Sequence, residues 1–279
     1  MKTRVISAAV GLALLAVVMV LFDTIAVNIA LTAIGGLAVY EVAKALKLDG
    51  KKVLYLPVIA FALLYFLFEL PDLLFVYVTM FVMFCVVMFS KDRHYLYKEG
   101  AAFAAAAILI VLGLGSILKM RALFANNKWD AVMALLFGLA TGWLCDTFAY
   151  TFGCLFGKRK MCPSISPNKT IAGGIGGVAG TPVCIALIYV IYALNAENSV
   201  FYGTVRPGTV LFFFAMGAVG AVLGIIGDLA ASYIKRECGV KDFGNIMPGH
   251  GGAYDRIDSV LFTCVFTYFC LSVFVKYVI

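Results

Sequence analysis

The segment Thr209–Ser259 reads TVLFFFAMGAVGAVLGIIGDLAASYIKRECGVKDFGNIMPGHGGAYDRIDS. It begins with an apolar run that is long enough to cross a bilayer as a helix, and it then changes to a charged, glycine-rich stretch. That stretch contains two basic clusters, the turn Pro248–Gly252, and two aspartates three residues apart, Asp255 and Asp258. Because charge is costly beside hydrocarbon, the pattern needs a functional reason, and binding of a polyanion with its metal ions would provide one.

The rest of the chain repeats the apolar half of this pattern. Of the 279 residues, 63% are hydrophobic and 13% are charged, and the apolar runs leave no segment for a separate soluble domain. Helices are predicted, because the spanning strands of a barrel would alternate in polarity. The predicted spans are 5–22, 24–46, 53–69, 72–90, 100–118, 129–155, 171–194, 209–231 and 257–278. We therefore predict an all-α, polytopic integral membrane protein with about nine transmembrane helices.

The positions of Lys and Arg predict the orientation, because these residues concentrate on the cytoplasmic side of a membrane. With nine spans, 17 of the 22 fall on the side of the N-terminus, and five fall on the other side, namely Lys119, Arg121, Lys128, Arg206 and Lys276. The N-terminus and the segment Ser232–Ser259 are therefore predicted to be cytoplasmic, and the C-terminus to lie outside. The lack of a transit-type leader favours a bacterial plasma membrane. The net charge of +7 is mostly this topology signal, and no nucleic-acid partner is expected.

Residues 1–279 are predicted to form a single membrane domain. Residues 1–128 hold mainly scaffold spans. Glu41 among them is interpreted as an interfacial carboxylate that reaches headgroup water, with a role in the site as the alternative. Residues 129–279 hold spans and cytoplasmic loops in which polar groups interrupt the apolar runs, so the functional site is predicted there. The glycines after Thr170 permit close helix packing or phosphate binding by backbone N–H groups. The eight cysteines lack metal-binding spacing and are interpreted as free thiols in the apolar core.

Three aspartates are the candidates for a metal site. Asp228 lies near the end of a predicted span, where a lone carboxylate usually faces a cavity or a partner charge. Asp255 and Asp258 open the last span, and a helix would place both on one face. Carboxylates suit a hard cation such as Mg²⁺, which also bridges phosphates. The alternatives are an ion pair of Asp228 with Lys235 or Arg236 and, for the other two acids, compensation of the helix dipole.

Basic residues and a histidine accompany these acids. His250 lies among glycines that would let a side chain approach a ligand, and simple solvent exposure is its alternative. The basic residues would contact phosphate, with arginine offering a two-pronged hydrogen bond, or would anchor the chain at the cytoplasmic face. They are Lys169, Lys235, Arg236, Lys241 and Arg256.

Motifs in this half of the chain resemble the signature of the phosphatidate cytidylyltransferases, also called CDP-diacylglycerol synthases. The main block comprises Asp228-Leu229, Ser232-x-x-Lys235-Arg236, Lys241-Asp242-x-Gly244, Pro248-Gly249-His250-Gly251-Gly252 and Asp255-Arg256-x-Asp258-Ser259. Two further blocks are Asp146-Thr147-x-Ala149-Tyr150-x-x-Gly153 with Gly157-Lys158, and Ser166-Pro167-x-Lys169-Thr170. Asn168 and Ala172 depart from the pattern, because the family commonly has lysine and glutamate there.

The resemblance implies an enzyme of phospholipid biosynthesis that makes CDP-diacylglycerol and pyrophosphate from CTP and phosphatidate at the lipid bilayer. It implies Mg²⁺ as the cofactor and leaves a second metal ion and a homodimer open. It assigns catalysis to Asp228, Asp255, Asp258 and His250, with the three aspartates as metal ligands. It assigns substrate binding to Asp146, Ser166, Lys169, Thr170, Ser232, Lys235, Arg236, Lys241, Asp242, Gly251, Gly252 and Arg256.

Other functions remain as alternatives at this point. An ion-coupled transporter would use Asp146 and Asp228 to relay protons or sodium, but no inverted repeat or matched pair of broken helices is visible. Another CTP-dependent lipid enzyme, such as a polyprenol kinase, is disfavoured by the motifs between Lys241 and Asp258. A non-catalytic relative stays open because of Ala172.

Overall fold

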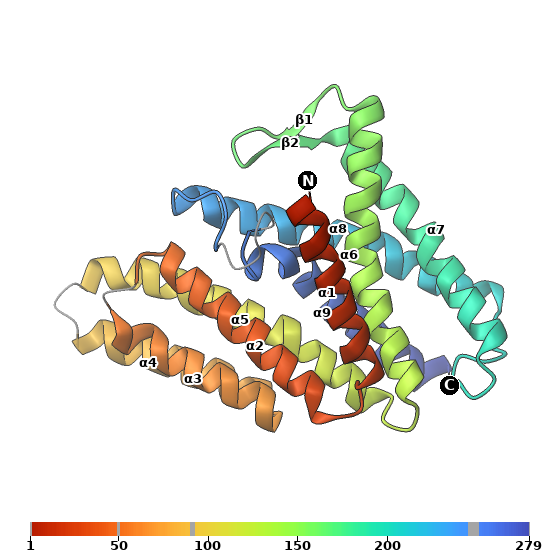
Figure 1. Cartoon of the computed structure of the whole chain (residues 1–279), viewed down its shortest axis with the longest axis horizontal. Coiled ribbons are helices and arrows are strands. Elements are labelled where there is room, and N and C mark those ends of the chain that lie inside the picture. The colour runs from red at the N-terminus through yellow and green to blue at the C-terminus, as the bar shows by residue number, and fades with distance from the viewer. Residues whose placement is uncertain (1, 49–50, 90–92, 245–250, 279) are drawn as a thin grey trace. The chain divides into compact units, whose positions relative to one another are not determined.

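The computed structural model describes residues 2–48, 51–89, 93–244 and 251–278, which form nine helices and one hairpin (Figure 1). The helices are α1 (Lys2–Val20), α2 (Ile25–Ala45), α3 (Lys52–Phe68), α4 (Asp72–Phe89), α5 (Arg93–Leu123), α6 (Lys128–Phe156), α7 (Ile171–Asn195), α8 (Pro207–Glu237) and α9 (Tyr254–Val278). The strands are β1 (Lys160–Cys162) and β2 (Ser166–Thr170). His250, the predicted catalytic histidine, lies outside the described residues.

Seven of the nine described helices, α2 and α4 to α9, are long and apolar enough to cross a membrane by length and composition. The segment Ala9–Val20 of α1 and helix α3 are shorter apolar helices. With 17 residues, α3 is about 25 Å long, slightly less than the hydrocarbon thickness of about 30 Å. The prediction of an all-α, polytopic integral membrane protein is confirmed, and the expected count of about nine spans is roughly consistent with these helices.

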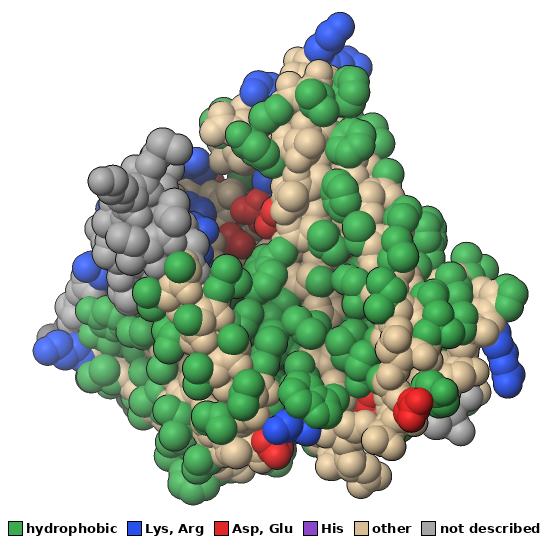
Figure 2. Space-filling view, turned by 45° about the vertical axis from the view of Figure 1, so that its right-hand side comes forward, with side chains coloured by type: hydrophobic (Ala, Val, Ile, Leu, Met, Phe, Trp, Pro, Cys, Tyr) green, Lys and Arg blue, Asp and Glu red, His purple; other side chains and the backbone are tan. Residues whose placement is uncertain are grey.

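Large apolar side chains face outward along many helices. On α4, Leu73 and Phe89 are each 82% exposed, and hydrophobic side chains cover much of the face seen in Figure 2. So much exposed apolar surface would drive aggregation in water, whereas acyl chains solvate it in a bilayer. The exposed side chains therefore agree with a membrane location.

The contacts group the chain into two compact units. The first consists of Met1–Leu118 and Lys235–Ile257, and the second of Lys119–Ile234 and Asp258–Ile279. The predicted division between a scaffold part, 1–128, and a functional part does not follow these units, because the segment Lys235–Ile257 groups with the N-terminal helices. The prediction of one membrane domain is not tested by this grouping.

Small residues allow close helix packing in the second unit. A Cβ atom at Gly176 of α7 would lie 2.4 Å from the Phe152 side chain of α6, and one at Gly227 of α8 would lie 2.6 Å from Phe262 of α9. The glycines at the start of α7 are buried against α6 and β1, and the N–H of Gly173 donates to the Thr170 side chain at 3.1 Å. The structure shows close packing for these glycines, and phosphate binding by their N–H groups stays a prediction.

The hairpin between α6 and α7 was not predicted from the sequence. Its strands are antiparallel, with Lys160 opposite Thr170 and Cys162 opposite Ser166, and the register shifts between these pairs. So short a ribbon is marginal alone, and here the chain runs from β2 directly into α7. The hairpin places Lys169 one residue before the Thr170 cap of α7. All eight cysteines are free thiols, but the expectation that they lie in the core holds only for Cys145, Cys264 and Cys270, since Cys154 is exposed and the other four are half-buried.

Candidate active site

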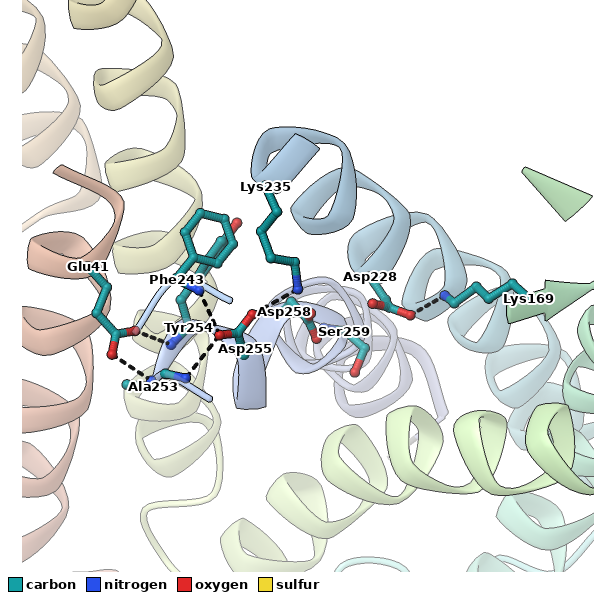
Figure 3. Close-up of polar contacts among 11 residues, drawn as sticks. Glu41, Lys169, Asp228, Lys235, Phe243, Ala253, Tyr254, Asp255, Asp258 and Ser259 are labelled. Carbon is teal, nitrogen blue, oxygen red and sulfur yellow. Dashed lines mark hydrogen bonds and ion pairs between the residues drawn. The ribbon is translucent and has the colours of Figure 1, made fainter. Parts of the chain in front are cut away.

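In the first unit, three hydrogen-bond donors among the described residues hold Asp255 at the start of α9 (Figure 3). Its Oδ1 accepts a bond from Nζ of Lys235 at 2.8 Å, and its Oδ2 accepts bonds from the backbone N–H groups of Phe243 and Gly252, each at 2.9 Å. The Asp255 side chain is 3% exposed and that of Lys235 is 12% exposed. A buried carboxylate is tolerated when its charge is paired and hydrogen-bonded. Asp255 meets both conditions.

The backbone around Asp255 approaches its carboxylate closely. Gly251 has a φ of +86°, in the region that L side chains rarely adopt, and a Cβ there would lie 3.0 Å from Oδ2 of Asp255 and 3.5 Å from Oδ1 of Asp242. The Lys235 ammonium also lies 5.6 Å from the centre of the Phe243 ring, a cation–π contact. These contacts give the Asp255 carboxylate one defined orientation.

The next two N–H groups along the chain are bound by Glu41 of α2. Its Oε1 accepts from Ala253 and its Oε2 from Tyr254, each at 3.0 Å, and Glu41 is 3% exposed. Our interpretation of Glu41 as a carboxylate that reaches headgroup water is therefore wrong. The available signal was weak: an acid at the end of an apolar span predicted to be cytoplasmic, on the same side as the charged segment.

In the second unit, Asp228 of α8 forms an ion pair with Lys169 of β2, and both side chains are 25% exposed. Asp146 of α6 is exposed and interacts electrostatically with both of them. The structure thus pairs Asp228 with Lys169 and Lys235 with Asp255, instead of pairing Asp228 with Lys235. Among the described residues, this group holds two carboxylates and one lysine, so it carries excess negative charge that another cation would stabilise.

Asp258 lies one helical turn after Asp255 in α9. It is 8% exposed, and its Oδ1 accepts a hydrogen bond from the Ser259 N–H at 2.7 Å. Asp255 is the acidic residue in the first turn of α9, so its charge also opposes the helix dipole. Asp255 can therefore both compensate the dipole of α9 and take part in the site.

The remaining predicted substrate-binding residues differ in exposure. Thr170 is 8% exposed and its side chain caps α7, and Ser232 of α8 is also 8% exposed. Ser166 in β2 is half-buried, and Gly252 is buried. The exposed residues of the set, which solution ligands can reach, are Arg236, Lys241, Asp242 and Arg256. Their binding roles, like those of the buried members, remain predictions.

The acids form no ready metal cluster in the described ranges. There, no group of three or more His, Cys, Asp or Glu side chains is arranged to hold a metal ion. The structure brings together Lys235, Asp242, Gly251, Gly252 and Asp255 in the first unit. It brings together Asp146, Lys169 and Asp228 in the second unit.

Comparison with known proteins identifies relatives that match nearly the whole chain. A sequence model of the cytidylyltransferase family matches residues 2–274. The chain is similar to the phosphatidate cytidylyltransferase of Bacillus subtilis (strain 168), with 29% identity over 285 residues that cover 98% of each protein. The phosphatidate cytidylyltransferases of Staphylococcus haemolyticus and Thermotoga maritima are each 34% identical to it, over 182 and 186 residues. Those two matches cover 65% and 66% of this chain and 62% and 63% of the relatives.

Proposed function

The chain belongs to the cytidylyltransferase family, and we propose from this premise that it transfers the cytidylyl group of CTP to phosphatidate. The products are CDP-diacylglycerol and pyrophosphate, and the reaction belongs to phospholipid biosynthesis. The observation that carries the proposal is the family match over residues 2–274. The relatives named phosphatidate cytidylyltransferase support the choice of lipid substrate. These comparisons disfavour a transporter and a polyprenol kinase.

The proposed chemistry is a displacement at phosphorus. A phosphate oxygen of phosphatidate attacks the α-phosphorus of CTP, and the bond from that phosphorus to the bridging oxygen breaks. Pyrophosphate leaves with the electron pair. Both reactants are anions, so catalysis consists mainly of positioning and charge neutralisation.

Basic side chains of the site supply the neutralising charge in this proposal. An ammonium group has three N–H donors, so Lys169 and Lys235 can each retain an aspartate and also bind phosphate. The exposed residues Arg236, Lys241 and Arg256 contact the triphosphate or the lipid phosphate. Acyl chains need no enclosed pocket, since they remain in the bilayer while the headgroup reaches the site.

Mg²⁺ is the proposed cofactor, with Asp228, Asp255 and Asp258 as its ligands. Carboxylate oxygens are the donors that Mg²⁺ prefers. A carboxylate offers about four lone-pair positions, and the three hydrogen bonds that described residues donate to Asp255 use one position on Oδ1 and two on Oδ2. The oxygen donors of these residues therefore suit the ion, and their assignment as its ligands is part of the proposal. When bound, Mg²⁺ would polarise the phosphoryl oxygens and neutralise developing charge.

The assay that tests this function uses the purified full chain in lipid nanodiscs with CTP, phosphatidate and Mg²⁺. We expect pyrophosphate and CDP-diacylglycerol in equal amounts, no release when phosphatidate is omitted, and reversible loss of activity with excess EDTA. Pyrophosphate release that needs no phosphatidate, or transfer of phosphate to a polyprenol instead, would overturn the proposal. Full activity in EDTA would refute the metal assignment alone.

We also propose that the N-terminus and the site face the cytoplasm of a bacterial plasma membrane, where CTP is present, and that the C-terminus lies outside. Asn126 and Ser164 are exposed in the structure and lie on opposite sides in this topology. After removal of the native cysteines, an impermeant thiol reagent on intact cells should label a cysteine at position 126 and not one at 164. The reverse pattern would refute the orientation.

A further inference from the structure

We propose that Glu41 is a positioning residue for Asp255. In this inference, the Glu41 carboxylate on α2 fixes the position of the first residues of α9. Those residues in turn orient Asp255 toward the reacting phosphates. The inference rests on the proposed function, because the role of Asp255 in the reaction comes from there. The contacts that support it lie within the first unit.

Three consecutive backbone N–H groups before and at the start of α9 are bound by carboxylates (Figure 3). Gly252 donates to Asp255 at 2.9 Å, and Ala253 and Tyr254 donate to the two oxygens of Glu41 at 3.0 Å. The first N–H groups of a helix have no partner inside the helix. Here water cannot easily replace the carboxylates, because Ala253 and Tyr254 are 6% and 3% exposed.

The sequence around α9 leaves room for this carboxylate. A Cβ atom at Gly244 would lie 2.2 Å from Oε1 of Glu41, and one at Gly252 would lie 2.4 Å from Oε2. Any side chain at either position would displace the Glu41 carboxylate. Both glycines belong to the signature motif, so the structure gives part of that motif a packing role toward α2 beside any contact with substrate.

The same contacts connect Glu41 to the reaction. Asp255 follows Tyr254 directly, and the N–H that binds its Oδ2 belongs to Gly252, the neighbour of Ala253. A shift of residues 252–254 therefore moves both the Asp255 backbone and one of its hydrogen-bond donors. A misplacement of about 1 Å at a reacting group can lower a rate about a hundredfold.

Glu41→Gln is the first test, in the full chain in nanodiscs. Glutamine has the shape of glutamate, but its NH2 group replaces one oxygen, so a donor would face one of the two N–H groups instead of an acceptor. We expect kcat to fall about 10- to 100-fold, the loss typical when a residue that orients a metal-binding side chain is replaced. The KM for phosphatidate should remain unchanged, because Glu41 contacts no exposed basic residue in these hydrogen bonds. Glu41→Asp keeps the charge and both oxygens but is one methylene shorter, and it should lose kcat similarly.

Hydrogen exchange supplies a readout that does not depend on turnover. In Glu41→Gln without nucleotide, amides of the peptide 252–255 should exchange about tenfold faster or more, since a buried charge-assisted bond is lost. Exchange in α3 and α4 of the same unit should stay at the wild-type rate. Uniformly faster exchange across the unit, with normal kcat per folded molecule, would reduce Glu41 to a general stabilising residue and overturn the inference.

Asp130→Asn is the matched control. Asp130 is fully buried and accepts bonds from the Tyr192 hydroxyl at 2.8 Å and the Val200 N–H at 3.1 Å, outside the candidate site. This variant should lower stability while folded molecules keep wild-type kcat. Inactive wild-type protein would refute the proposed function, whereas active wild type with a fully active Glu41→Gln variant would refute only the positioning role. If Glu41→Gln fails to fold, Glu41→Asp decides by the same measurements.

Discussion

Asp255 and Asp228 each pair with a lysine, but the two pairs have different surroundings. The Asp255 side chain is 3% exposed and receives two backbone N–H bonds besides the bond from Lys235. Asp228 and Lys169 are each 25% exposed, and no backbone donor is recorded for Asp228 in the described part of the chain. Partly solvated pairs contribute little to stability, whereas a buried charge depends on every one of its partners.

The difference indicates that Asp255 and Asp228, two acids of the same signature motif, have different functions. Asp255 is held in place by Lys235 of α8 and by backbone N–H groups of the segment before α9, so it is oriented before any substrate arrives. The Asp228–Lys169 pair can rearrange at low cost, because water compensates for lost contacts. We therefore expect substrate and metal binding to change the contacts of Asp228 and Lys169 more than those of Asp255.

The largest expected effects come from removing the two acids. Asp228→Asn and Asp255→Asn should each abolish pyrophosphate release, because each removes a proposed metal ligand. Their stabilities should differ: Asp255→Asn should cost about 3–5 kcal/mol because it leaves Lys235 largely buried without its anion. Asp228→Asn should cost less than about 1 kcal/mol. Thermal unfolding in detergent measures the difference, and equal losses would show that the two pairs are not distinct.

Substituting the two lysines should have different main effects, on stability for Lys235 and on CTP binding for Lys169. Lys235→Ala should destabilise the fold by about 3 kcal/mol or more, since it isolates a buried carboxylate. Lys169→Ala should weaken apparent CTP affinity by about 1.5–3 kcal/mol, the contribution of one charge-assisted contact. Its stability should change by less than about 1 kcal/mol. CTP titrations of the rate, together with unfolding curves, test both variants, and unchanged CTP affinity in folded Lys169→Ala would reduce Lys169 to a membrane anchor.

A smaller effect is expected from a single methyl group beside Glu41. Gly252→Ala places a Cβ 2.4 Å from the Glu41 carboxylate and should cost about 1–3 kcal/mol through overpacking. Gly208→Ala is the matched control, because a Cβ at that position of α8 has no described neighbour within 4 Å. The control should leave the unfolding midpoint unchanged or slightly raised. A Gly252→Ala variant as stable as the control would mean that the loop before α9 yields easily, and Asp255 would not be rigidly held.

The sequence predicted the helices well because the property that selects them is local. Each span is a run of adjacent apolar residues, and lipid requires the backbone of such a run to bond internally. Helix ends were less predictable: α8 continues past the predicted end at residue 231 to Glu237 and so carries Lys235 and Arg236 in its last turn. The hairpin of β1 and β2 lacked a strong pattern, since its strands have only three and five residues.

The order of acidic, basic and glycine residues from Asp146 to Ser259 also determined the family, because a motif is a property of the chain itself. Only the tertiary structure decided which charges meet. Lys235 pairs with Asp255 and Lys169 with Asp228, and Glu41 binds N–H groups 212 and 213 residues away in the chain. Such contacts depend on how helices pack, and packing is set by the shapes of many distant side chains together. For that reason a carboxylate in an apolar span could be read as a surface group until the fold showed it capping α9.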